Sequence, residues 1–350
     1  MTPTDHLFPL LRKLLFSLEP ERSHALALSA LEQPWLRRWF EPTEPRPDKA
    51  VSAFGLDFAN AVGLAAGLDK NGDHIDALGA LGFGHIEIGT ITPKPQDGNP
   101  KPRLFRLEQY GALINRMGFN NKGVAHLVAN AEKRQYKGVL GINIGKNATT
   151  PIENALDDYR HCLERVFPVA DYVTVNISSP NTKNLRALQD EEPLRALLGE
   201  LREQQALLAA KHAREVPLLV KIAPDVSDVQ LDGICNVARA LALDGMIVGN
   251  TTLERASVEP HVHAGEAGGL SGAPLRPLAD SRLAATLERL DGEVPVIGVG
   301  GIDSGAAAAN KIELGAQLVQ IYTGFIYHGP ALVRAAVRAT SALADDVKPS

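Results

Sequence analysis

Polar side chains recur along this sequence directly after short apolar runs. Any one of them is ordinary turn chemistry. We expect two lysines and three asparagines among them to point into one cavity. Such a cluster is explained if it binds an anionic ligand rich in hydrogen-bonding groups, so we expect a binding site of this kind. The residues concerned are Asp69 and Lys70, Thr90, Asn143, Asn176, Lys221, Asn250 and Thr251, Gly300 and Gly301, and Tyr322 and Thr323.

The glycines near the C-terminus predict a phosphate site. Val299-Gly300-Gly301-Ile302 precedes a helix that we expect to open at Asp303-Ser304, and a second glycine-containing turn follows at 320–324. Glycine lets backbone N–H groups approach a phosphate closely, and a helix N-terminus adds a positive dipole. This is the arrangement of a barrel phosphate site after strands seven and eight, so we expect the ligand to carry phosphate.

The two lysines suggest different chemistry. Lys70 follows Gly67-Leu68-Asp69 and is well placed to pair with a substrate carboxylate. Lys221 ends an apolar run, 218–220, and a buried ammonium there needs an anionic partner. It suits the electron-rich edge of a reduced flavin, or it could form a Schiff base, and the residues alone leave both open.

The segment 176–182 places two hydroxyls between two amides. An unactivated serine is a poor base, so a catalytic role for Ser179 would demand a dry site and a relay through a neighbouring hydroxyl or water. Thr182 is the nearest candidate for that relay.

These residues need an architecture that brings them to one rim. Strand-like runs alternate with helical patterns throughout, which predicts an α/β fold of the (β/α)₈ TIM-barrel type with catalytic groups at the C-terminal strand ends. A doubly wound sheet is the rival, but no glycine-rich dinucleotide fingerprint follows the first strand. The expected strands are 61–67, 84–92, 139–147, 171–178, 217–223, 245–251, 295–300 and 318–323, and the helices lie near 71–81, 120–134, 151–167, 190–213, 227–243, 277–290, 303–315 and 329–345.

Composition narrows the class of protein. The 350 residues are 45% hydrophobic and 22% charged with two cysteines, which excludes a disordered, collagenous or disulfide-stapled chain. The net charge of −5 and the lack of a long basic run argue against nucleic acid as a partner. No apolar run approaches the roughly 18 residues of a membrane span.

The first forty residues predict an amphipathic helical pair. Apolar residues recur at helical spacing over 5–18, and a second helix after Pro20 would carry Leu28, Leu31 and Trp35 along one side. We interpret 41–50 as a linker around a proline-rich stretch. The pair could lie on lipid, as Trp35 and Trp39 would favour, or simply pack on the body of the protein, and a net charge of +1 over 1–40 decides neither.

Four motifs together resemble one enzyme family. They are 63–70 (GLAAGLDK), 114–121 (INRMGFNN), 176–182 (NISSPNT) and 299–302 (VGGI), which are similar to those of dihydroorotate dehydrogenase, the flavin enzyme of pyrimidine synthesis. The chain further resembles the quinone-dependent class. That class has serine where the soluble class has cysteine, as at Ser179, and it carries an N-terminal helical pair, as residues 1–40 would supply.

The resemblance implies roles for individual residues. Ser179 would be the base that removes the C5 proton of dihydroorotate while the C6 hydride passes to FMN, with Phe119 and Thr182 holding a relay water. Orotate would be held by Lys70, Asn115, Arg116, Met117, Gly118, Phe119, Asn176, Asn181, Asn250 and Thr251. FMN would be held by Ala66, Gly67, Leu68, Asp69, Lys70, Thr90, Asn143, Asn176, Lys221, Gly249, Gly272, Gly301, Tyr322 and Thr323.

The resemblance also implies an electron acceptor and a location. A membrane quinone would enter between the N-terminal helices, residues 1–40, and reach the flavin past Arg106 and Tyr322. Residues 51–345 would form the FMN-binding barrel, attached peripherally to the cytoplasmic face of a bacterial-type inner membrane. One position departs from the pattern, since the family usually has a hydroxyl residue where Gly249 offers backbone alone.

Three rival functions remain from the residues. A phosphate-binding barrel aldolase or isomerase would use Lys221 as a Schiff base without flavin. A silent flavoprotein or membrane-bound interaction module would keep the barrel without the chemistry. The soluble class of the same enzyme would use fumarate or nicotinamide. We expect no metal, because His261 and His263 share a loop with no evident third ligand.

Overall fold

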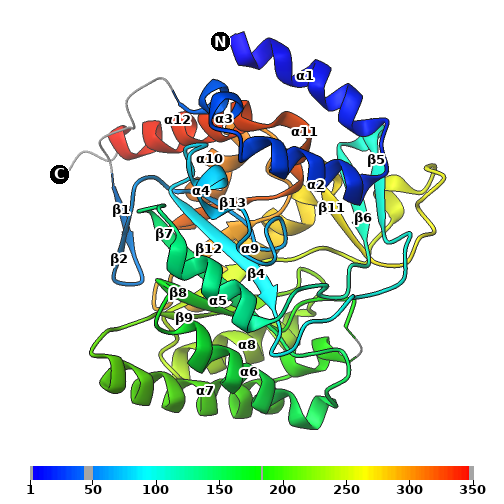
Figure 1. Ribbon diagram of the computed structural model, residues 1–350. Coiled ribbons are helices and arrows are strands. Elements are labelled where there is room, and N and C mark those ends of the chain that lie inside the picture. The colour runs from blue at the N-terminus through cyan, green and yellow to red at the C-terminus, as the bar shows by residue number, and fades with distance from the viewer. Residues whose placement is uncertain (1–2, 43–49, 183, 347–350) are drawn as a thin grey trace.

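The centre of the molecule is a closed barrel of eight parallel strands (Figure 1). The computed structural model describes residues 3–42, 50–182 and 184–346. The barrel strands are β3 (Val62–Leu64), β4 (His85–Ile91), β7 (Val139–Ile144), β8 (Tyr172–Asn176), β9 (Leu218–Ile222), β10 (Gly245–Val248), β12 (Val296–Val299) and β13 (Leu318–Ile321). The closed strand order confirms the (β/α)₈ barrel and rules out the doubly wound sheet.

Helices follow the strands and cover the outside of the barrel. Each of the eight expected helices is present, namely α4 (Ile75–Gly79), α5 (Val124–Lys133), α6 (Ala155–Val166), α7 (Glu191–His212), α8 (Asp228–Ala240), α9 (Arg276–Leu290), α10 (Gly305–Glu313) and α12 (Pro330–Asp346). A short helix that the sequence did not predict, α11 (Thr323–His328), begins directly after the last strand.

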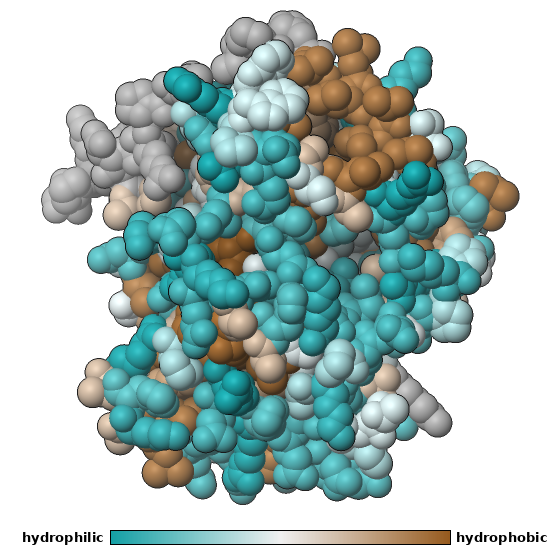
Figure 2. Space-filling view, in the orientation of Figure 1, coloured by the Kyte–Doolittle hydropathy of each residue, from teal (hydrophilic) through white to brown (hydrophobic). Residues whose placement is uncertain are grey.

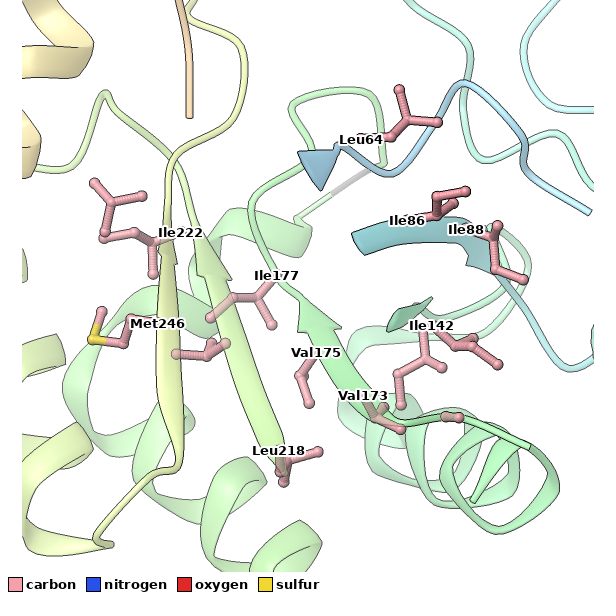
Figure 3. Close-up of a cluster of buried hydrophobic side chains, with 14 of the residues drawn as sticks. Leu64, Ile86, Ile88, Ile142, Val173, Val175, Ile177, Leu218, Ile222 and Met246 are labelled. Atoms are coloured by element: carbon pink, nitrogen blue, oxygen red, sulfur yellow. The ribbon is translucent and has the colours of Figure 1, made fainter. Parts of the chain in front are cut away.

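Alternate side chains of the barrel strands point outward to the helices and inward to the barrel interior. Outward residues such as Leu64, Ile142 and Val175 join one large apolar cluster with the helices, part of which Figure 3 shows. Inward residues near the start of the strands, including Leu219 and Ile297, form a second apolar cluster. Because successive side chains of a strand point to opposite faces, the polar residues at alternate positions of the same strands point into the barrel.

Two small sheets lie outside the barrel. The first is a hairpin of β1 (Val51–Ala53) with β2 (Leu56–Phe58), whose Phe58 packs in the inward apolar cluster. A three-stranded antiparallel sheet, which the sequence did not predict, joins β5 (Leu104–Leu107), β6 (Ala112–Asn115) and β11 (Gly269–Gly272). Its strands come from two distant loops, so the sheet ties those loops together.

The N-terminal extension consists of three helices, which corrects the expected pair. After α1 (Pro3–Phe16), the helix expected beyond Pro20 divides into α2 (Pro20–Leu31) and α3 (Pro34–Phe40), because Pro34 starts a new helix. Trp35 therefore lies on α3. Hydrophobic side chains are gathered over α1 in Figure 2. The predicted linker falls largely on 43–49, outside the described residues. Within the described part of the chain, no helix has the length and apolar character to cross a bilayer.

Candidate active site

A cavity opens at the C-terminal ends of the barrel strands, and most of the predicted site residues line it. The lining also includes parts of β6 and β11, so the three-stranded sheet forms one wall. The predicted residues found there are Ala66, Gly67, Lys70, Thr90, Asn115, Met117, Gly118, Phe119, Asn176, Ser179, Asn181, Lys221, Gly249, Asn250, Thr251, Gly272, Gly300, Gly301, Tyr322 and Thr323.

Five residues predicted to hold FMN or orotate, or to relay the proton, do not line this cavity. The Arg116 guanidinium pairs with Glu266 at 2.7 Å and lies over the Phe105 ring. The Asp69 carboxylate accepts hydrogen bonds from the backbone N–H groups of 71, 73 and 74, so it holds a turn. Leu68 and Asp69 line a second groove, which is described below. Asn143 lies beneath the cavity, where it accepts a hydrogen bond from Thr90. Thr182 is buried beside the Ser179 segment.

The cavity also contains polar residues that the sequence reading missed. Gln320 and Ser271 line it, and buried Glu87 lies below. Gln320 stands between Val319 and Ile321, and Glu87 between Ile86 and Ile88. A polar residue in the middle of an apolar strand was the available signal, which a reading of strand ends alone passes over.

The glycine turn after β12 has the form expected of an anion site. Gly300 and Gly301 have φ of 103° and 71°, and a Cβ on Gly301 would come within 2.4 Å of Arg276. Arg276 Nε donates to the Gly301 carbonyl at 2.9 Å, and its guanidinium pairs with Asp303. Both glycines line the cavity, so their backbone is within reach of a ligand there. The Ser304 hydroxyl caps α10, which begins at Gly305.

Burial lowers the pKa of both lysines at the cavity. Burial lowers the pKa of Lys70 to about 8, while the nearby Glu21 charge opposes this effect, and the ammonium donates to the Gly67 carbonyl at 2.9 Å. Burial also lowers the pKa of Lys221, against the opposing charge of Glu87. Lys221 borders the cavity, so its ammonium is placed to pair with an anionic group of a ligand.

The Ser179 hydroxyl lies at the cavity wall with little pre-activation. It is 5% exposed, and its oxygen accepts a hydrogen bond from the Asn181 backbone N–H at 3.2 Å. The Asn181 amide in turn donates to the Asn115 carbonyl at 3.2 Å. Phe119, on the same wall, is a non-glycine residue with φ of 54°, a strained conformation of the kind that clusters at functional sites.

A second, apolar groove runs under the N-terminal helices. Its volume is about 640 Å³, and α1, α2 and α3 supply much of its lining, including Phe8, Leu28 and Leu36. Arg106 lies in this groove. Lys70, Met117 and Tyr322 line both the groove and the cavity, so these three residues form a shared wall.

Comparison with known proteins decides the family. A family model described as dihydroorotate dehydrogenase matches residues 49–341. A dihydroorotate dehydrogenase (quinone) from Neisseria meningitidis is 54% identical over 333 residues, which cover 95% of this chain and 99% of that protein. The chain belongs to the quinone-dependent dihydroorotate dehydrogenase family.

Further members of the dihydroorotate dehydrogenase family agree. A dihydroorotate dehydrogenase (quinone) from Chromobacterium violaceum is 56% identical over 337 residues, covering 96% of this chain and 98% of that protein. The solved structure of the Eimeria tenella enzyme in complex with ferulenol superposes with a TM-score of 0.85 at 36% identity and covers 95% of each chain. The dihydroorotate dehydrogenase (quinone) activity expected from the sequence is thereby confirmed, and the aldolase, silent-flavoprotein and soluble-class alternatives are set aside.

Proposed function

We propose that this dihydroorotate dehydrogenase binds FMN and dihydroorotate in the cavity, and that a membrane quinone collects the electrons in the groove. The observation that carries this proposal is the shared wall of Lys70, Met117 and Tyr322. Both half-reactions of such an enzyme must meet at one flavin, while a polar substrate and an apolar quinone need different surroundings. Two cavities of opposite character with one common wall meet both requirements.

The residues at the cavity suit FMN. The backbone at Gly300 and Gly301 would hold its phosphate, and Lys221 would supply the cation for its electron-rich edge. The Thr251 hydroxyl is buried without a hydrogen-bond partner, which supports a ligand nearby. Gly249 lines the cavity with backbone alone. When bound, FMN supplies the acceptor for the hydride that leaves C6 of dihydroorotate.

The chain's own groups would hold and deprotonate the substrate. Lys70 would pair with the carboxylate, and the amides of Asn115, Asn181 and Asn250 would bind the ring. Ser179 Oγ would accept the proton from C5. Since a hydroxyl is a weak base, a water held beside Phe119 and Thr182 would relay that proton onward.

The groove is suited to a quinone and its exposed rim to lipid. Arg106 and Tyr322 are the polar groups that would meet a quinone head group, and α1 to α3 supply apolar walls for its tail. Leu10 and Leu14 on α1 and Trp35 and Trp39 on α3 are more than half exposed. Exposed aromatic and leucine side chains of this kind sit at a lipid interface, so we infer peripheral attachment to the cytoplasmic face of the inner membrane.

An anaerobic titration of the purified protein with dihydroorotate tests the proposal. We expect the visible flavin band to bleach and a soluble quinone to restore it. A colourless protein would exclude FMN. A yellow protein that dihydroorotate fails to bleach would exclude the substrate site, and a bleached protein that quinone fails to reoxidise would exclude the groove as the quinone site.

A further inference from the structure

The Arg186 guanidinium binds three loops beside the cavity. Arg186 lies on a short 3₁₀ helix, η3 (Leu185–Gln189), between β8 and α7. Its Nε donates to the Ser178 carbonyl at 2.9 Å, and its Nη2 donates to the Thr251 carbonyl at 3.0 Å. Its Nη1 pairs with the Asp225 carboxylate at 2.6 Å. One planar group therefore joins the loops that follow β8, β9 and β10.

The Asp225 carboxylate anchors this guanidinium. Its Oδ2 accepts a hydrogen bond from the Leu253 backbone N–H at 3.2 Å as well as from Arg186, and its Oδ1 accepts from the Thr252 hydroxyl. The two charged side chains are 21% and 20% exposed, so the pair is partly shielded from water. Because the N–H donors of a guanidinium form a rigid planar fork, the anchored group aims its remaining donors in fixed directions.

The bond to the Ser178 carbonyl restricts where Ser179 lies. The atoms of a peptide group are nearly coplanar, so a bond to the carbonyl oxygen of residue 178 also constrains the Cα atom of residue 179. The Asn176 amide accepts from the N–H and the hydroxyl of Ser178, and the Asn250 amide donates to that hydroxyl. These bonds leave rotation about the Cα–C bond of Ser178 open. The Arg186 bond restricts that rotation.

Ser179 is thereby held from both sides. On the far side, its Oγ accepts from the Asn181 backbone N–H, and the Asn181 amide is bonded to the Asn115 carbonyl. On the near side, Arg186 links the peptide group before Ser179 to the carbonyl of Thr251, another residue of the cavity wall. Proton transfer depends steeply on this placement, since an error of about 1 Å at a reacting group can cost roughly 10²-fold in rate.

We propose that Arg186 is a positioning residue for proton abstraction, which places the Ser179 hydroxyl at the C5 proton of the substrate. It acts through the Ser178 peptide group rather than by contact with the ligand. The inference rests on the proposed function, in which Ser179 is the base that accepts that proton. Flavin reduction by dihydroorotate should therefore depend on Arg186, whereas reoxidation by quinone should not.

A second pair of the same chemistry provides a matched control. Arg202 donates to Asp244 at 2.8 Å, the two side chains are 27% and 28% exposed, and Asp244 also accepts from the Leu218 backbone N–H at 2.7 Å. Leu218 begins β9 and Asp244 precedes β10, so this pair bridges the N-terminal ends of two strands whose C-terminal ends Arg186 and Asp225 bridge. A mere loss of fold stability should appear in variants of either pair.

The first test compares Arg186→Lys with Arg202→Lys in the FMN-loaded full-length protein by stopped flow. Lysine keeps a charge near Asp225, but a compact ammonium does not reproduce the fork that binds two carbonyls at once. We expect flavin reduction by dihydroorotate to slow about tenfold in Arg186→Lys, with FMN content and reoxidation by quinone within about twofold of wild type. Arg202→Lys should keep all three within about twofold of wild type.

Amide hydrogen exchange provides a readout that does not depend on turnover. If the Arg186 bond restrains the loop that carries Ser179, the amides of residues 177–182 should exchange faster in Arg186→Lys than in the wild-type protein. Arg202→Lys should leave the exchange of this segment unchanged.

A double-mutant cycle separates positioning from a general loss of structure. If Arg186 acts through the Ser179 hydroxyl, removal of that hydroxyl leaves the arginine nothing to position. The double variant Ser179→Ala with Arg186→Lys should then reduce its flavin at a rate within about twofold of Ser179→Ala alone. A general defect would multiply instead, and the double variant would be about tenfold slower than Ser179→Ala.

Each outcome supports or overturns the inference. Slow reduction confined to Arg186→Lys, and absent on the Ser179→Ala background, supports it. Wild-type reduction or exchange in folded Arg186→Lys, equal slowing in Arg202→Lys, or multiplied effects in the double variant would overturn it. If Arg186→Lys does not fold, Asp225→Asn removes the anchor and decides by the same cycle, with Asp244→Asn as its control. If neither variant of the pair folds, the pair serves stability and the inference is wrong. Wild-type reduction in Ser179→Ala would instead refute the proposed base, and the inference would fall with it.

Discussion

The Arg106 guanidinium lies 4.5 Å from the centroid of the Phe16 ring and donates a hydrogen bond to the carbonyl oxygen of Phe16 at 3.0 Å. It donates a second bond, at 2.8 Å, to the Leu18 carbonyl. One side chain from β5 therefore fixes the turn that joins α1 to α2 while it lines the apolar groove.

Replacing Arg106 should separate the two half-reactions. Arg106→Ala leaves the α1–α2 turn without its donor, and we expect quinone turnover to fall about tenfold or more. Bleaching of the flavin by dihydroorotate should keep its wild-type rate in stopped-flow measurements. Arg22→Ala, an exposed change on α2, is the control. Equal slowing of both half-reactions would refute the groove assignment.

Lys70 predicts a pH dependence of substrate binding. Its pKa in the ligand-free protein is lowered to about 8, so the ammonium needed by a substrate carboxylate is present below pH 8 and lost above it. We expect the KM for dihydroorotate to rise above pH 8, approaching about tenfold per pH unit. Lys70→Gln should raise KM at neutral pH and abolish this rise. Lys122→Gln, which removes an exposed partner of Asp73, should retain it.

The lowered pKa of Lys70 also predicts how the stability of the fold depends on pH. Because the folded value lies below the unfolded one, the folded state disfavours the protonated amine, and the free energy of unfolding should gain a contribution between about pH 8 and pH 10.5. Denaturant titrations of wild type and Lys70→Gln over this interval would measure the difference. A difference that falls as pH rises would contradict the assignment.

Substitution of Ser179 should slow one step and spare binding. In Ser179→Ala the C5 proton loses its acceptor, and we expect flavin reduction by dihydroorotate to slow by about 10²- to 10⁴-fold, with FMN content unchanged. In Ser179→Cys the reduction rate should depend on a lower pKa than in wild type, since a thiol ionises more readily than a hydroxyl. Rapid reduction in the alanine variant would remove Ser179 as the base.

The glycine turn after β12 predicts a specific loss of cofactor. Gly301→Ala places a methyl group against Arg276 at a positive φ, so the turn must shift and FMN should bind at least about tenfold more weakly. Gly199→Ala on α7 meets no atom within 4 Å and should keep full FMN content. Fluorescence of released flavin measures both. Wild-type retention in Gly301→Ala would refute the phosphate site.

Membrane binding should depend on the exposed residues of α3. Trp35 and Trp39 are 66% and 57% exposed, and their joint replacement by alanine should reduce sedimentation with phospholipid vesicles severalfold. Leu207 and Val229, at least as exposed on α7 and α8, form the matched control pair. The effect should persist in high salt, because residues 1–40 carry little net charge. Equal losses in both pairs would contradict an α3 attachment surface.

The barrel could be predicted from sequence because its strands end in polar groups at regular intervals. Residues on strand ends, such as Thr90 and Asn176, were found for that reason. Glu87 and Gln320 were missed because they stand inside strands, where inward and outward positions differ by one residue and the register of the closed barrel decides which is which. Sequence periodicity does not contain that register.

Other features depended on long-range pairing or local breaks. The sheet of β5, β6 and β11 joins residues over 150 positions apart, such as Asn115 and Gly269, so no local pattern predicted it. The division between α2 and α3 was missed because the apolar spacing continues across Pro34. The Arg116 side chain stands next to cavity residues in sequence, yet its ion pair with Glu266 holds it outside.

The wall shared by the cavity and the groove affects how the enzyme can be inhibited. A compound that fills the groove leaves the Ser179 face of the cavity open, so it should lower the maximal rate without competing against dihydroorotate. The shared wall of Lys70, Met117 and Tyr322 is the exception, since a bulky compound that displaces one of these side chains would change both the groove and the cavity. Substitutions on α1 to α3 that weaken an inhibitor in the groove should therefore leave dihydroorotate oxidation nearly unchanged. Substitutions of the shared-wall residues should slow both dihydroorotate oxidation and quinone reduction.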